Sequence, residues 1–338
     1  MKFDIHLAPA SLSHIPSLAR QAESIGASGV WANETQHDPF LPLALAAEHT
    51  SRIELGTAVA IAFARSPTVV AHTAWDLAEL SGGRFRLGLG TQVKAHVERR
   101  FGMTWEAPVP RLREYLQAVR VVWDSWQNRT RLNYRGQHYK LTLMTPFFSP
   151  NPIDHPRIPI FIAGVNPPLC RLAGELADGF HVHPYHTVKY LAEVVRPAMA
   201  EGAARAGREM SAIEIATSTF VILGETEAER AADREAMRAQ ISFYASTPSY
   251  RGVMETHGWG ETGAALSALA SRGQWGEMPR LIADEMLATF AVEGTWADIG
   301  LELRERYSGL ADRVSLYRPF TGERADDWRR VADAARSA

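Results

Sequence analysis

The chain has 338 residues, of which 46% are hydrophobic and 22% charged, and its formal net charge is −2. This length suits either one large α/β barrel or two ordinary domains, and the composition is typical of a soluble globular protein. The near-neutral charge gives no reason to expect nucleic acid or an anionic membrane as a partner.

Cysteine usage and hydropathy indicate the compartment. Cys170 is the single cysteine, so no disulfide can form within the chain, which fits a reducing cytoplasm. The first residues contain no apolar run long enough for a signal peptide. Nowhere does an apolar run reach the roughly 18 residues of a spanning helix. We therefore expect a cytoplasmic protein with no membrane partner.

The first half of the chain alternates short apolar runs with stretches of helical period. These runs predict strands at residues 3–8, 30–34, 52–61 and 82–91. The helices after the second and third runs begin with a capping residue followed by proline, at Asp38–Pro39 and at Ser66–Pro67.

The second half continues the same alternation, with two interruptions. Strands are predicted at residues 158–164, 176–184, 212–223 and 312–320. Thr226 and Glu229 form a capping-box pattern at the start of the seventh helix. Residues 128–157 are expected to form a small hairpin and a surface excursion. Residues 243–294, rich in aromatic residues and glycine, separate the seventh strand from the eighth.

Repeated strand–helix units predict an α/β fold with a parallel sheet covered on both faces. Eight such units suit a single (β/α)₈ TIM-barrel domain over residues 1–338, with insertions. No G-x-G-x-x-G motif follows the first strand, which disfavours a dinucleotide-binding fold. The largest insertion, residues 243–294, is predicted to lie at the carboxyl-terminal mouth of the barrel as a lid over the substrate.

Several motifs resemble a known superfamily. "LAELSGGRFRLGLGT" at 77–91, with "LGTAVAIAFARSPTVVAHTAWDL" before it, resembles the luciferase-like monooxygenases, as do "IPIFIAGVNPP" and "LAGELADGF". Members of that superfamily hold a flavin or the deazaflavin coenzyme F420 in a (β/α)₈ barrel. "ETQHDPF", "GTQV" and "RRFG" resemble most a group assigned to F420.

The resemblance implies three cofactor-binding segments. A cis peptide between Ala58 and Val59 would support the central ring, and the wall beside it would come from Thr91, Gln92 and Val93. Several relatives have glycine or a carboxylate at this second segment, so an acid/base role for Gln92–Val93 stays open. The third segment, Ala163, Gly164, Val165 and Asn166, would hold the phosphate or ribityl chain. Amides at a helix start attract an anion, and Asn166 also fits a plain N-cap.

Glu34 and His37 fall where relatives carry an acidic residue and a histidine beside the reactive ring edge. Imidazole titrates in the range that proton transfer requires, so His37 is the predicted general acid/base and Glu34 its orienting partner or a cofactor ligand. In the alternative reading, Glu34 pairs with a neighbouring arginine and His37 lies in a solvated loop. Asp38 is assigned to helix capping.

Other polar residues lead to further predictions. A basic cluster, Arg65, Lys94, Arg99 and Arg100, would either hold the anionic tail of F420 or form a solvated surface. His181 and His183 resemble a zinc-binding pair, but the first strand offers only His6, in its middle, so no metal is expected. One of the pair is expected to point inward, and His183 is assigned to the cofactor.

The favoured hypothesis is an F420-dependent oxidoreductase that transfers a hydride to or from a small alcohol, carbonyl compound or enone. The alternatives are an FMN-dependent monooxygenase that uses reduced flavin and O₂, a non-catalytic flavin-binding barrel and, last, a metal hydrolase. We also expect a homo-oligomer, a dimer, with a small-molecule substrate as its other partner.

Overall fold

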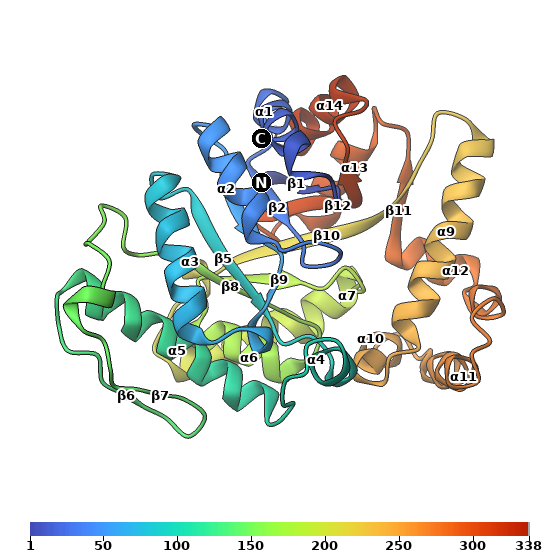
Figure 1. Cartoon of the computed structure of the whole chain (residues 1–338). Helices are drawn as coiled ribbons and strands as arrows, with labels where there is room; N and C mark the ends of the chain where they lie inside the picture. The colour runs from blue at the N-terminus through green and yellow to red at the C-terminus, as the bar shows by residue number, and fades with distance from the viewer. Residues whose placement is uncertain (337–338) are drawn as a thin grey trace.

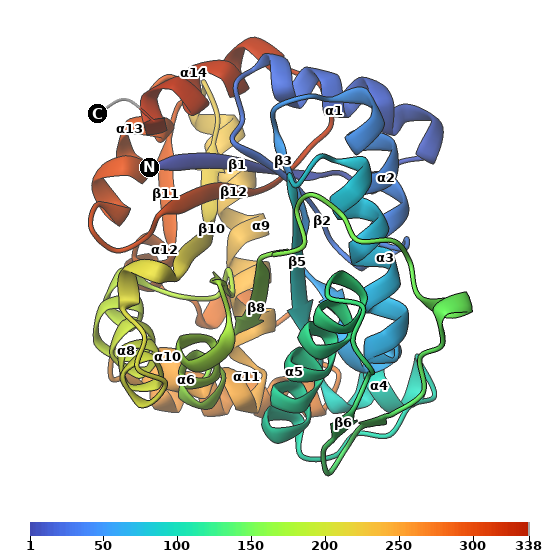
Figure 2. The same ribbon diagram turned by 90° about the vertical axis from the view of Figure 1, so that its left-hand side faces the viewer.

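A computed structural model describes residues 1–336 and contains a closed barrel of parallel strands (Figures 1 and 2). The strands are β1 (Lys2–Leu7), β2 (Gly29–Ala32), β3 (Glu54–Thr57) with β4 (Ala60–Ile61), β5 (Phe85–Gly90), β8 (Ile160–Gly164), β9 (Gly179–Val182), β10 (Glu214–Leu223) and β12 (Arg313–Phe320). β12 pairs with β1, and β10 pairs with both β9 and β12, which closes the ring. The predicted α/β barrel is confirmed.

Helices surround this barrel (Figure 2). They are α1 (Ile15–Ser24), α2 (Phe40–His49), α3 (Pro67–Leu80), α5 (Pro108–Gln127), α6 (Pro167–Leu176), α8 (Arg196–Arg205), α9 (Glu227–Ala245), α13 (Ile299–Tyr307) and α14 (Ala325–Arg336). Short helices α4 (Lys94–Arg99) and α7 (Val188–Tyr190) follow β5 and β9, and a π-helical turn at Leu191–Val195 joins α7 to α8. The sequence predicted one continuous helix at 187–206.

The third predicted strand is divided. The peptide bond between Ala58 and Val59 is cis, as the resemblance predicted, and separates β3 from β4. β3 pairs with the start of β5 and β4 with its end, so the division leaves the barrel wall closed.

The segment between β10 and β12 contains more structure than the sequence indicated. After α9 come α10 (Arg251–Glu255), α11 (Gly260–Ser271) and α12 (Asp284–Phe290), followed by β11 (Ala291–Gly294). β11 pairs in parallel with the second half of β10 and was missed by the sequence analysis, because four residues ending in Glu293–Gly294 carry little strand signal. The lid function of residues 243–294 stays a prediction.

The local capping predictions are confirmed. Asp38 Oδ1 accepts hydrogen bonds from the amides of Phe40 and Leu41 at 2.8 and 3.2 Å, although α2 begins after Pro39 rather than at it. Ser66 caps α3, and Thr226 with Glu229 forms a capping box on α9. The predicted hairpin is present as antiparallel β6 (Tyr134–Arg135) and β7 (Lys140–Leu141).

A buried ion network lies at the end of the barrel where the strands begin. Arg313, whose side chain has no exposed surface, donates from Nε and Nη2 to both carboxylate oxygens of Asp4, at 2.7 and 2.8 Å. Its Nη1 also donates to Glu54 and Glu214, at 2.5 and 3.3 Å. The guanidinium lies 5.3 Å from the ring of Trp31, the next layer of the interior. This network therefore connects the first and last strands of the ring.

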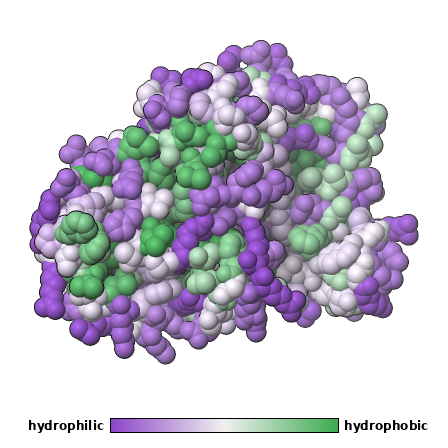
Figure 3. Space-filling view, in the orientation of Figure 1, coloured by the Kyte–Doolittle hydropathy of each residue, from purple (hydrophilic) through white to green (hydrophobic). Residues whose placement is uncertain are grey.

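Hydrophobic side chains gather on the surface over α2 and α3 (Figure 3). Leu41, Val69 and Leu80 of these helices are all more than half exposed. A second exposed apolar group, Leu143 with Phe147 and Phe148, lies beside the β6–β7 hairpin. No helix within residues 1–336 is long and apolar enough to cross a membrane.

Removal of Arg313 tests the network. Arg313→Ala leaves the buried carboxylate of Asp4 without its partner, and we expect a loss of about 3–5 kcal/mol in the free energy of unfolding. The matched control is Arg205→Ala, which breaks an exposed pair with Glu201 and should cost at most about 1 kcal/mol. Urea unfolding measures both. Equal small losses would show that the network does not stabilise the barrel.

Candidate active site

A cavity of about 790 Å³ opens at the carboxyl ends of the barrel strands. Its lining comes from strands all around the ring and from Tyr244, Ser249 and Tyr250 at the start of the insertion. Ligand pockets of TIM barrels lie at this end, and this volume is within the range of pockets that bury a cofactor or drug-sized molecule. Of the predicted site residues, all twelve line the cavity: Glu34, His37, Ala58, Val59, Thr91, Gln92, Val93, Ala163, Gly164, Val165, Asn166 and His183.

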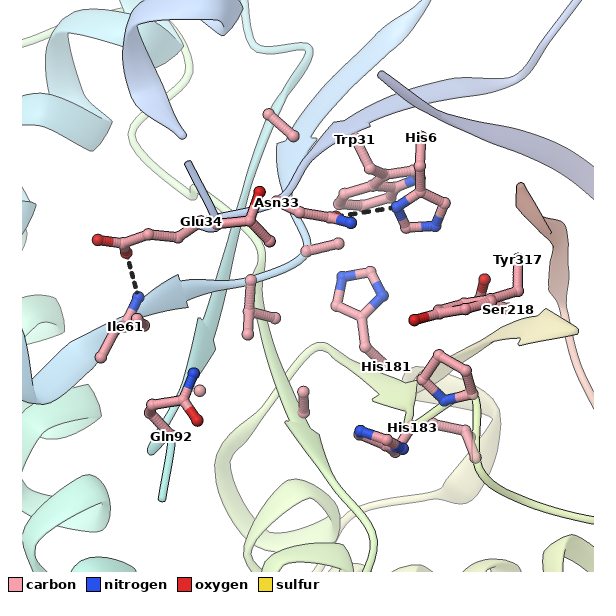
Figure 4. Close-up of a pocket in the computed structure, with 18 of the residues that line it drawn as sticks. His6, Trp31, Asn33, Glu34, Ile61, Gln92, His181, His183, Ser218 and Tyr317 are labelled. Carbon is pink, nitrogen blue, oxygen red and sulfur yellow. Dashed lines mark hydrogen bonds between the residues drawn. The ribbon is translucent and has the colours of Figure 1, made fainter. Parts of the chain in front are cut away.

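Glu34 holds two strand ends together. Its Oε2 accepts a hydrogen bond from the amide of Ile61 at 2.7 Å (Figure 4) and another from Arg65 Nη1 at 2.7 Å. Arg65 also donates to Asp38 at 2.9 Å. Burial lowers the pKa of Arg65, but the hydrogen bonds and charges of Glu34 and Asp38 outweigh this and raise it. The reading in which Glu34 pairs with a neighbouring arginine is thus the observed geometry.

His37 lies on the exposed rim of the same cavity. Within residues 1–336 its ring makes no hydrogen bond, and Glu34 is engaged with Arg65 and Ile61 rather than with the imidazole. The structure therefore does not place Glu34 as the orienting partner of His37. The catalytic role of His37 itself stays a prediction.

The three predicted cofactor segments meet along one side of the cavity. Gln92 adopts a positive φ of 60°, and its side chain accepts a hydrogen bond from the amide of Val93. At the third segment, Asn166 caps α6 through the amide of Leu169, at 3.4 Å. Pro167 and Pro168 have no N–H, so the helix itself offers fewer donors than the sequence analysis assumed. Val165 and Asn166 carry the remaining amides at this corner.

Histidines form part of the cavity interior (Figure 4). Both His181 and His183 line the cavity, whereas the sequence analysis expected one to point inward. The correction follows from strand geometry, because residues i and i+2 project to the same face. The ring of His181 packs edge-on against Trp31, with centroids 4.7 Å apart, and lies 5.1 Å from the ring of Phe161.

His6 is a cavity residue that the sequence analysis mentioned only as a poor metal ligand. Its Nδ1 lies 3.0 Å from Asn33 Oδ1 (Figure 4), and its Nε2 lies 3.2 Å from Ser315 Oγ. Burial lowers the pKa of His6, and the hydrogen bond to Asn33 partly opposes this. Alternation along the first strand was the available signal, since Asp4 and His6 alternate with apolar residues and therefore share one face.

The predicted basic cluster is not a single site. Arg65 is engaged with Glu34 and Asp38, whereas Lys94, which lines the cavity, is 66% exposed and lies 3.8 Å from Glu98. Arg99 and Arg100 are exposed on and beside α4. Within residues 1–336, no three His, Cys, Asp or Glu side chains are grouped as a metal site requires.

Comparison with known proteins gives the family. A family model described as luciferase-like monooxygenase matches residues 2–313. The chain belongs to the luciferase-like monooxygenase family. Within this family, an uncharacterised protein of Mycobacterium tuberculosis is 47% identical over 306 residues, which cover 90% of each chain.

Named relatives are more distant. A 5,10-methylenetetrahydromethanopterin reductase of Archaeoglobus fulgidus is 29% identical over 308 residues, 88% of each chain. The solved structure of a coenzyme F420-dependent tetrahydromethanopterin reductase from Methanopyrus kandleri has a TM-score of 0.79. It is 23% identical and covers 98% of this chain and 97% of its own, which supports the shared barrel fold. The chain is therefore a luciferase-like oxidoreductase.

Three histidines with lowered pKa values, the buried His186 and the cavity-lining His181 and His183, predict acid sensitivity. Burial lowers the pKa of His181 and His183 to about 3 and that of His186 to about 4. In the unfolded chain these imidazoles bind protons as the pH falls through about 6.5, whereas the folded chain resists protonation until the pH approaches these lowered values. The stability that depends on these neutral histidines is therefore fully present above about pH 6.5 and is lost progressively as the pH falls below this value.

We expect each histidine to lower the free energy of unfolding by about 1.4 kcal/mol per pH unit between about pH 6 and pH 4. Urea unfolding at a series of pH values measures this slope. His181→Phe should reduce the slope by up to about 1.4 kcal/mol per pH unit. A slope unchanged by this substitution would show that His181 protonates equally in both states.

Proposed function

We propose that the chain transfers a hydride between coenzyme F420 and a small uncharged organic substrate. The observation that carries the proposal is the 790 Å³ cavity, which adjoins the cis peptide Ala58–Val59 on one side and the start of α6 on another. Relatives of this family include proteins named for F420, which supports the deazaflavin over FMN.

The residues present fit such a cofactor. The interior offers uncharged polar groups, such as Gln92 and His181, to the carbonyl and N–H groups of a flat heterocycle. The amides of Val165 and Asn166 suit a phosphate, and the positive end of α6 adds to this attraction. Exposed Lys94, Arg99 and Arg100 suit the longer anionic tail that F420 carries and FMN lacks.

When bound, the deazaflavin supplies the carbon that accepts or donates the hydride. The chain supplies the surroundings of that step. Glu34 and Arg65 fix the ends of β2 and β4 beside the cis peptide. This half-buried ion pair would therefore hold in place the backbone on which the cofactor's ring rests. His37 on the rim would exchange a proton with the substrate during turnover, because it lies where cavity and solvent meet.

Cofactor titration tests the proposal. Purified protein should bind F420 with a micromolar or lower Kd, measured by quenching of the coenzyme's fluorescence, and should bind FMN much more weakly. Lys94→Glu should weaken F420 binding in a salt-dependent way, with a smaller effect on FMN. Micromolar binding of FMN with no binding of F420 would instead favour the flavin-dependent monooxygenase.

Two substitutions distinguish the catalytic role proposed for His37 from the structural role of Glu34. His37→Ala should lower turnover by about 10² or more, with F420 affinity and thermal stability unchanged, because the exposed ring makes no bond that holds the fold. Glu34→Gln should lower the free energy of unfolding by about 1–3 kcal/mol through loss of the ion pair with Arg65. Unchanged turnover in His37→Ala would remove His37 from the mechanism.

The expected homodimer is also a proposal. The exposed apolar surface over α2 and α3 supports it, because contiguous apolar surface often marks a subunit interface. Sedimentation velocity gives the oligomeric state directly.

A further inference from the structure

The end of the cavity farthest from Glu34 and Gln92 has an aromatic wall (Figure 4). His183 follows β9 there, with its ring 4.8 Å from the ring of Tyr244 and 4.8 Å from that of Tyr250. Tyr317 of β12 completes the group, and its hydroxyl lies 2.8 Å from that of Tyr244. All four residues line the cavity. Their rings offer flat apolar faces to a planar ligand.

The hydrogen bonding of His183 fixes its tautomer. The backbone amide of Tyr185 donates to Nδ1 at 3.1 Å, so Nδ1 must carry a lone pair rather than a proton. The imidazole is therefore neutral and its single proton resides on Nε2. Within residues 1–336, Nε2 has no hydrogen-bond partner. The pKa of His183, lowered by burial to about 3, agrees with a neutral ring. The Nε2–H of His183 is thus a donor that no other described residue uses.

The tyrosine pair offers a second donor. One of the two hydroxyls donates to the other across 2.8 Å, and the acceptor's own proton then has no partner among the described residues. Burial raises the pKa of Tyr244, so this hydroxyl stays protonated at neutral pH.

Among residues 1–336, no unpaired cation lies at this end of the cavity to balance a negative ligand. Arg318, which lines this end, pairs with Asp233, and Arg313 beneath the cavity pairs with Asp4. Lys94 lies on the opposite side, beside Gln92, and is largely exposed. A carboxylate or phosphate would lose its hydration without gaining an opposite charge, so this end favours an uncharged acceptor.

We propose that this end of the cavity binds a planar, uncharged enone, with its carbonyl oxygen accepting the Nε2–H of His183. The assignment rests on the proposed function and moves His183 from the cofactor to the substrate. In the reduction of an enone, the β-carbon receives a hydride from the reduced deazaflavin and the α-carbon receives a proton. The carbon–carbon double bond becomes single and the carbonyl is retained. The group that binds the carbonyl oxygen and the group that protonates the α-carbon must therefore lie at different positions. A cavity with one donor at each end fits this requirement.

The first test measures binding without turnover. Cyclohex-2-en-1-one is titrated into the protein by calorimetry, with cyclohexene and cyclohex-1-ene-1-carboxylate as ligands that lack the neutral oxygen. We expect the enone to bind at least tenfold more tightly than either. His183→Phe keeps a ring but loses the donor and should weaken enone binding about tenfold. His183→Gln, which can present a donor at the same reach, should restore most of it.

Controls make the outcome specific. His96→Phe makes the same change at an exposed histidine outside the cavity lining and should leave enone affinity unchanged. The same variants are titrated with F420. Loss of F420 affinity in His183→Phe, with enone affinity retained, would overturn the proposal and return His183 to the cofactor. Failure of F420 to bind any variant, with enone binding intact, would sink the proposed cofactor while the enone site stands.

A measurement on the unmodified protein covers the case in which His183→Phe does not fold. Nitrogen-15 spectra of histidine-labelled protein distinguish the two neutral tautomers from imidazolium. We expect His183 as the Nε2–H tautomer at pH 7, with its Nε2 signal shifted by cyclohex-2-en-1-one. An Nδ1–H tautomer, an imidazolium or an unshifted signal would each contradict the proposal.

Discussion

The buried guanidinium of Arg313 is the interaction on which the architecture of the cavity rests. A charge with no exposed surface is tolerable only when carboxylates surround it, and Asp4, Glu54 and Glu214 come from three other barrel strands. The same cation supports the ring of Trp31 from below. Trp31 in turn packs against His181, which lines the cavity. The position of the cavity floor therefore depends on the ion network directly beneath it, of which Asp4 reaches the cavity lining.

This layered packing requires glycines at some positions as well as large side chains at others. A Cβ at Gly56 would lie 2.2 Å from the ring of Trp31, and one at Gly29 would lie 2.7 Å from Arg313. Interior layers of a TIM barrel are closely packed, so a bulky residue on one strand demands a small one on its neighbour. Gly29 of β2 and Gly56 of β3, which reduce local strand propensity, thus make space for the side chains that support the cavity.

Sequence reasoning recovered features whose causes are local or repeated. Strand–helix alternation gave the barrel, and cap residues gave the starts of α3 and α9. It also selected strand ends that meet at one cavity, since all twelve predicted site residues line it. It did not identify the partners of residues far apart in the chain: an arginine partner for Glu34 was an alternative without a residue number, and no partner was named for His6. Glu34 meets Arg65 across 31 residues and His6 meets Ser315 across 309, and no periodicity encodes either contact.

The arrangement of ionised and neutral groups around the cavity determines which chemistry the cavity favours. Ionised groups near it, such as Glu34 with Arg65 and Asp4 with Arg313, are held in pairs, whereas His181 and His183 are neutral. Creating an isolated charge in such an interior is costly. A hydride carries two electrons and one proton together, so its transfer to an uncharged substrate moves one negative charge, which the proton delivered to that substrate then neutralises. A neutral lining with donors fixed in advance requires little reorganisation during that transfer. The electrostatics of the cavity and the proposed reaction thus support each other.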